Sequence, residues 1–154
     1  MIVYRITLSN FANDLSGTGS SFLGARWNKQ GTFMLYCASN VSLASLEVLA
    51  NSQTIYDIET LKLVIINIPE TVSINILEEE SLAKDWTQNI HYSQNVGTNW
   101  LKKSNSLVLS VPSAVVPIDK NILINPAHPD FHKVEIIDMV DYHFDNRLFK
   151  THVF

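Results

Sequence analysis

The sequence predicts a mixed α+β fold, built on a split and mainly antiparallel β-sheet with flanking helices. Segments rich in β-branched and aliphatic residues between turn formers outnumber the helical segments. Most of them follow one another after an early helix, whereas a parallel doubly wound sheet requires regular alternation. The 154 residues are 46% hydrophobic, enough for one continuous core. Because no repeat or linker divides the chain, we expect a single domain over residues 1–154.

The expected strands begin near the N-terminus and dominate the second half of the chain. They are Ile2–Ile6, Phe33–Ala38, Leu61–Ile68, Leu107–Val116 and Asn121–Asn125, with two short additions at Lys133–Ile137 and Tyr142–Leu148.

Helical patterns are fewer. We expect a helix over Val41–Asn51, preceded by the possible caps Ser39 and Asn40. A short helical segment is expected at Glu79–Trp86 and a further helix at Asn95–Lys103.

Composition restricts the class of partner. The formal net charge is −4, and lysines and arginines are scattered, so a phosphate-tracking groove for nucleic acid is not expected. Charged residues make up only 17% of the chain, which favours an apolar face for a constitutive partner. The longest apolar run, Leu63–Ile66, is too short to span a bilayer, and the first ten residues do not resemble a signal peptide. We expect a soluble, cytoplasmic protein without a membrane anchor.

Common nucleotide-binding motifs are missing. Neither GxxxxGK[ST] nor GxGxxG after a strand occurs, and the nearest candidate, Ser16 to Ser20, lacks the third glycine and the lysine. The glycine- and serine-rich stretch before Gly24 is instead expected to be a flexible loop that brings backbone N–H groups close to a ligand. This loop leads directly to Arg26, Trp27 and Asn28.

Arg26 is the first candidate site residue. Its guanidinium offers forked donors for a diphosphate or carboxylate, and the neighbouring Trp27 could stack on a flat ring. The alternative is a surface ion pair for Arg26 and a core position for Trp27.

Glu47 lies near the middle of the expected helix, where no residue three or four positions away is basic. Its carboxylate either points to water or is held in an apolar cleft for a purpose, and the sequence leaves both open. Ser113 follows Pro112, which interrupts a hydrophobic strand. Such a point is an edge, a bulge or a bend, where a side chain can be aimed at a ligand. No GxSxG surrounds Ser113, so hydrogen bonding suits it better than a nucleophilic role, and a turn serine is the alternative.

His128 and His132 suggest a metal site, but Pro126 and Pro129 break the helix that the four-residue spacing would need. We therefore expect no metal. Cys37 is the single cysteine, so an internal disulfide is excluded. It lies in an apolar strand, and we expect it to be a small buried hydrophobic residue.

Several motifs occur together and in order: GARWN, GTFMLYCA, SLASLEVL, VPSAVVP, NILINPAHPDF and FDNRL. With Tyr4 and Arg5 at the start, they resemble the RES domain family, named for its Arg, Glu and Ser, over essentially the whole chain.

The resemblance implies an ADP-ribosyltransferase-like fold and a toxin of a toxin–antitoxin pair. Such a toxin consumes NAD as substrate, without a further cofactor, and is inhibited by an Xre-type helix-turn-helix antitoxin, with homo-oligomers possible in the complex. The family's residues correspond to Arg26, Glu47 and Ser113, and Tyr36 matches a family aromatic near the ligand. One departure is Ala25, where many members have glycine.

The resemblance also assigns roles. A carboxylate at Glu47 would stabilise the oxocarbenium-like centre formed when the nicotinamide–ribose bond breaks. Arg26 would bind the diphosphate, Ser113 would orient the ribose or nicotinamide half, and Tyr36 or Trp27 would provide an aromatic wall. The acceptor stays open between water, phosphate and a protein side chain, so protein ADP-ribosylation is an alternative, as is a non-catalytic interaction module.

Overall fold

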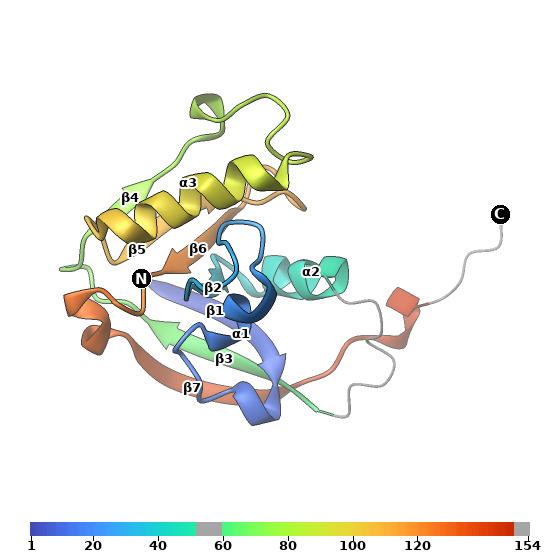
Figure 1. The fold of residues 1–154 in the computed structure, drawn as a ribbon. Coiled ribbons are helices and arrows are strands. Elements are labelled where there is room, and N and C mark those ends of the chain that lie inside the picture. The colour runs from blue at the N-terminus through green and yellow to red at the C-terminus, as the bar shows by residue number, and fades with distance from the viewer. Residues whose placement is uncertain (52–59, 150–154) are drawn as a thin grey trace, which may run out of the picture.

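The computed structural model describes residues 1–51 and 60–149, and these build one seven-stranded sheet in the order β4-β5-β6-β2-β1-β3-β7 (Figure 1). The strands are β1 (Ile2–Leu8), β2 (Leu35–Ala38), β3 (Leu61–Asn67), β4 (Ile74–Ile76), β5 (Val108–Pro112), β6 (Lys120–Ile124) and β7 (Glu135–Tyr142). Neighbouring strands run antiparallel except β4 and β5, which are parallel. The predicted mainly antiparallel α+β class is confirmed.

The described residues also form three α-helices and four short 3₁₀ helices. They are α1 (Thr18–Leu23), α2 (Val41–Asn51) and α3 (Ile90–Lys103), with single 3₁₀ turns η1 (Ser9–Phe11), η3 (Glu79–Ser81), η4 (Pro129–Lys133) and η5 (Asn146–Phe149). Asn40 caps α2 by accepting a hydrogen bond from the Leu43 backbone N–H at 2.8 Å. Asn89 caps α3 in the same way through Tyr92 at 3.2 Å.

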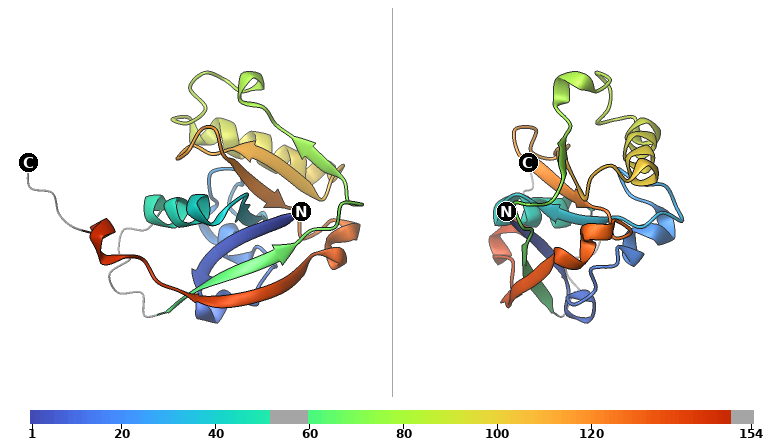
Figure 2. Two further views of the ribbon diagram at one scale, coloured as in Figure 1. Left: turned by 180° about the vertical axis from the view of Figure 1, so that it is seen from behind. Right: turned by 90° about the vertical axis from the view of Figure 1, so that its left-hand side faces the viewer.

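Helices α2 and α3 cover one face of the sheet (Figure 2). The core under α3 contains the three tryptophans, and the core under α2 contains Leu43 and Ala44. The opposite face packs against loop residues, and successive strand residues alternate between the cores, as Val108 and Leu109 do.

The sheet opens between β1 and β2. Strand β1 pairs with β3 along its whole length, from Ile2 to Leu8, but the register joins it to β2 only through Tyr4 and Ala38. Since β2 continues to pair with β6 from Leu35 to Ala38, the two halves of the sheet diverge from this point. This is the split that the sequence predicts.

Several predicted elements need correction. The expected strand Leu107–Val116 ends at Pro112, because residues 113–119 form a turn. The helix expected at Glu79–Trp86 is only the 3₁₀ turn η3. The strands expected at Lys133–Ile137 and Tyr142–Leu148 are replaced by the single strand β7 and by η5.

Other differences add structure where none was expected. Part of the stretch expected as a flexible loop forms α1, preceded by Gly17 at φ +73°. Strand β4 was not expected, and α3 begins at Ile90 rather than at Asn95. Within the described ranges, none of the helices is both long enough and apolar enough to cross a membrane.

Candidate active site

A cleft of about 630 Å³ lies where β1 and β2 diverge. Its walls come from both strands, from α1, from the loop that carries Arg26, from α2 and from the turn after β5. Consecutive residues of β1, from Tyr4 to Leu8, all border it, so the cleft lies between the strands rather than on one face of the sheet. Its volume suits a small-molecule ligand.

Glu47 faces this cleft from the middle of α2. Its Oε1 accepts two hydrogen bonds, one from Ser113 Oγ at 2.8 Å and one from Asn121 Nδ2 at 2.6 Å. Among the described residues, Oε2 has no hydrogen-bond partner. The carboxylate is therefore fixed by one oxygen, which leaves the other for a ligand.

Ser113 is fully buried in the turn after β5. Its oxygen accepts hydrogen bonds from the backbone N–H groups of Val115 and Val116, each at 3.0 Å, while its proton goes to Glu47. All the hydrogen-bonding capacity of the hydroxyl is used. The geometry matches a positioning role, because two backbone N–H groups occupy the oxygen lone pairs that a nucleophile would need.

Arg26 lies in the loop of residues 24–34, called here the arginine loop. Gly24 has φ +74°, and a Cβ there would lie 2.7 Å from the Asn28 carbonyl oxygen, so glycine is required at the start of the loop. The backbone of Ala25 donates to the same oxygen at 3.0 Å and closes the turn around Arg26.

Helix α3 holds this turn from outside. Gln94 Nε2 donates to the Ala25 carbonyl at 3.0 Å, and the Lys29 N–H donates to Thr98 Oγ1 at 3.0 Å. Between them, Gly97 packs so closely that a Cβ would lie 1.9 Å from the Trp27 carbonyl oxygen. Residues three and four apart share one face of a helix, so one face of α3 contacts the loop on both sides of Arg26.

Arg26 borders the cleft, and its guanidinium is oriented by the segment before α3. Its Nη1 donates to the Thr87 carbonyl at 3.0 Å, and its Cζ lies 6.0 Å from the Trp86 ring centroid. The described residues give Arg26 no carboxylate partner, so the alternative of a surface ion pair does not apply.

Trp27 borders the cleft but is only 1% exposed, and its ring packs against Trp86 with centroids 5.5 Å apart. It matches the alternative of a core anchor. Tyr36 is the aromatic that lies between cleft and core: its hydroxyl accepts from the Trp27 N–H at 3.0 Å and donates to Asn28 Oδ1 at 2.7 Å. Burial raises the pKa of the Tyr36 hydroxyl well above its ordinary value, so it stays protonated as a donor.

Asn28 was expected to contact the ligand, but it is not among the residues that border the cleft. It is fully buried, and its Nδ2 donates to the carbonyls of Ser20 at 3.0 Å and Thr32 at 2.8 Å. With Oδ1 bound to Tyr36, the amide braces the arginine loop from inside.

Two residues of the cleft were missed from the sequence. Asn121 binds Glu47 directly, and the signal was a polar side chain in the apolar strand β6. Arg5 borders the cleft from β1, where a charged residue interrupts an otherwise apolar alternation.

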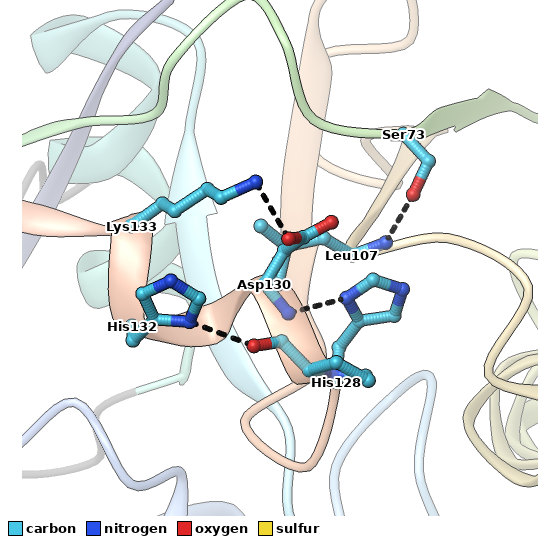
Figure 3. Close-up of polar contacts among 7 residues, drawn as sticks. Ser73, Leu107, His128, Asp130, His132 and Lys133 are labelled. Atoms are coloured by element: carbon cyan, nitrogen blue, oxygen red, sulfur yellow. Dashed lines mark hydrogen bonds and ion pairs between the residues drawn. The ribbon is translucent and has the colours of Figure 1, made fainter.

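His128 and His132 each bind a backbone group of their own segment. His128 Nδ1 accepts from the Asp130 N–H at 3.1 Å, and His132 Nδ1 donates to the Pro129 carbonyl at 2.7 Å. Figure 3 shows the two rings lying apart, each turned to its own partner. Over residues 1–51 and 60–149, no three metal-ligating side chains come together.

Comparison with known proteins identifies the family. The model of the RES domain matches residues 2–145. The chain belongs to the RES domain family. A protein named Toxin Res from Photorhabdus laumondii is 38% identical over 98% of this chain and 99% of its own length, and Toxin Res from Yersinia enterocolitica is 34% identical over 96% and 99%. The prediction of a RES domain toxin is thereby confirmed.

Two further relatives extend the comparison. The Prs ADP-ribosylating toxin of a Sphingobium species is 32% identical over 90% of this RES chain and 89% of its own length. A chain in the crystal structure of the M. tuberculosis MbcT-MbcA toxin-antitoxin complex shares the fold, with a TM-score of 0.74, 19% identity and coverage of 92% and 83% of the two chains.

Proposed function

We propose that this RES domain toxin takes NAD as its substrate and breaks the bond between nicotinamide and ribose. The observation that carries the proposal is the Glu47 carboxylate, held by Ser113 and Asn121 at the wall of the cleft with Oε2 left for a ligand. The Sphingobium relative is named as an ADP-ribosylating toxin, and ADP-ribosylation is a reaction that uses NAD.

Glu47 supplies the negative charge that this reaction needs. As nicotinamide leaves with the bonding electron pair, positive charge develops on the ribose, and a fixed carboxylate stabilises it without reorganising. Nicotinamide is neutral once released, so the departure needs no proton from the protein. This accounts for the lack of a histidine among the described residues that border the cleft.

Arg26 binds the diphosphate in this proposal. Its Nη1 is occupied by the Thr87 carbonyl, which orients the remaining N–H groups for a phosphate. Ser113 acts on the sugar through Glu47, because the hydroxyl proton is donated to that carboxylate. Tyr36 closes the cleft beside the arginine loop.

The group that captures the ADP-ribosyl cation decides which reaction results. Water or phosphate gives NAD degradation, which we favour, and a protein side chain gives ADP-ribosylation, the activity in the name of the Sphingobium relative. An antitoxin partner follows from the relatives named as toxins and from the toxin-antitoxin complex with the same fold. We propose an Xre-type antitoxin and a cytoplasmic site of action.

The purified protein should be incubated with NAD labelled in the adenylate half, with and without inorganic phosphate and with cell extract. Free ADP-ribose identifies water as acceptor, its phosphorylated form identifies phosphate, and a labelled protein band identifies ADP-ribosylation. Intact NAD in all three incubations contradicts the proposal.

A non-catalytic interaction module would behave differently in cells. Growth arrest that persists in the Glu47→Gln variant at equal protein level, with an unchanged NAD pool, would favour that class.

A further inference from the structure

Strands β4 and β7 are the two outer edges of the sheet, and they differ in how they are protected. Strand β7 carries three acidic residues and a bulge opposite Ile65 and Ile66, and Asp138 accepts from the Met139 N–H at 2.8 Å. Bulges and charged side chains keep an edge from pairing with another strand. Strand β4, Ile74–Ile76, has neither a charged residue nor a bulge.

The backbone of β4 directs hydrogen-bonding groups away from the sheet. The Leu77 N–H donates to the Ser110 carbonyl at 2.8 Å, and the Ser73 carbonyl accepts from a β5 N–H at 3.2 Å. Ser73 and Leu77 therefore turn their backbone groups toward β5. Because these groups alternate along a strand, those of Ile74 and Ile76 point away from β5. Among the described residues, no strand lies on that side.

A second copy of β4 fits this edge in an antiparallel register centred on Asn75. Ile74 of one copy then lies opposite Ile76 of the other, and each such pair exchanges two backbone hydrogen bonds. The Ile76 side chain, 64% exposed in the single chain, packs against Ile74 across the interface. The pairing thus satisfies the outward backbone groups and covers an exposed apolar side chain.

The other face of this edge is polar. Asn75 lies on the face that α3 covers, since its neighbour Leu109 belongs to the core under α3. A groove of about 350 Å³ lies there between β4 and α3, which stand side by side in Figure 1, and Asn75, Asn99 and Asn105 border it. In the antiparallel register the two Asn75 amides face each other, and each amide can both donate and accept.

Free charges of opposite sign lie at the two ends of β4. The last turn of α3 carries Lys102 and Lys103 and lies at the start of β4, where a backbone N–H after α3 donates to Ser73 Oγ at 3.1 Å. Glu79 and Glu80 follow the end of β4 in η3. Within the described ranges, none of these four charged side chains forms an ion pair.

We propose that the β4 edge is an interface with a second copy of this chain, formed by antiparallel pairing of two β4 strands about a twofold axis. Antiparallel pairing brings the lysines of one copy to the glutamates of the other at both ends, whereas parallel pairing would place like charges together. Strands β5, β6 and β2 separate this edge from the cleft, so both clefts stay open. The inference does not depend on the substrate.

Sedimentation velocity of the purified protein over a range of concentrations tests the interface. We expect a reversible dimer that weakens as the salt concentration rises. Ile76→Pro removes an outward N–H that the fold does not use, so the variant should fold normally. It should raise the dimer dissociation constant at least about tenfold. Ile76→Val keeps the N–H and is the matched control, which should dimerise like the wild type.

A charge exchange distinguishes this interface from any other. The double variant Lys102→Glu, Lys103→Glu has acidic residues at both ends of the edge, and Glu79→Lys, Glu80→Lys has lysines at both ends. Each should be monomeric alone, because like charges meet in its dimer. An equimolar mixture should form a dimer with one copy of each, since every contact then joins opposite charges.

A wild-type chain that stays monomeric at all concentrations overturns the inference. A dimer that persists in Ile76→Pro overturns it as well, and so does a mixture of the two charge variants that stays monomeric. If the melting curve shows that Ile76→Pro is unfolded, the charge variants decide. Monomeric variants should cleave NAD at the wild-type rate, so a failure of the proposed function would appear separately.

Discussion

Ser113 donates its hydroxyl proton to Glu47 across 2.8 Å, although 66 positions separate them in the sequence. A second set of hydrogen bonds joins the same two segments. The Ser113 N–H donates to the Asp119 carbonyl at 3.0 Å, and the Asp119 carboxylate accepts from Asn40, which caps the helix of Glu47. The serine turn and the glutamate helix are thus joined at two points, which fixes the carboxylate relative to the cleft.

Ser113→Ala should lower kcat by about 10- to 100-fold, because it removes a hydrogen bond to a charged group. Steady-state kinetics with NAD measure the effect. Since Ser113 acts through Glu47, the loss should be much smaller in a Glu47→Gln background. Ser110→Ala, in the buried strand β5 that precedes the turn of Ser113, is the matched control and should retain wild-type kcat.

Asn121→Ala should reduce kcat about tenfold, because the 2.6 Å bond from its amide orients the same carboxylate oxygen. Asn121→Asp should reduce it further, since a second carboxylate there repels Glu47. The kcat values of the two variants, measured at equal concentrations of folded protein, test both expectations. A more active aspartate variant would contradict the role given to the amide.

Gly97→Ala should lower the free energy of unfolding by at least about 2 kcal/mol, because the new Cβ would lie 1.9 Å from the Trp27 carbonyl oxygen. It should also weaken NAD binding by displacing the arginine loop from α3. Denaturant unfolding gives the first value. Gly19→Ala, where a Cβ meets nothing within 4 Å, should not lower stability. Equal stability of both variants would contradict this packing.

Cys37 should resist alkylation in the folded protein. Burial raises the pKa of its thiol to about 12, so very little thiolate exists at pH 8. The folded state holds this proton more tightly than the unfolded state, so the thiol contributes stability that is lost as the pH rises from the ordinary thiol pKa of 9.0 to about 12. Mass spectrometry after iodoacetamide treatment should show modification only with denaturant. Rapid native labelling would contradict the burial.

Arg26, Glu47 and Ser113 could be predicted because the motifs that contain them occur in the order found in the family. Helix α2 could be predicted because a capping residue precedes a helical pattern of apolar residues. Their mutual contact was not predictable, since Ser113 and Glu47 meet only through strand pairing of β5, β6 and β2. Asn121 was missed for the same reason: it lies beside Glu47 through sheet order, which a local pattern does not contain.

The errors in the elements also have physical causes. Residues 113–116 look like a continuing apolar strand, but the backbone N–H groups of Val115 and Val116 turn inward to Ser113. The arginine loop depends on Gly97, which is distant in sequence. Such long-range packing decides where Arg26 lies, and no local propensity reports it.

The most direct measurement of the central claim is the rate of nicotinamide release from NAD by the purified wild-type protein and by Glu47→Gln, compared at equal folded concentration. Glutamine keeps the shape of the side chain and removes its charge. We predict release by the wild type and a loss of at least about 100-fold in the variant. Equal rates for the two proteins, or no release by the wild type, would contradict the account.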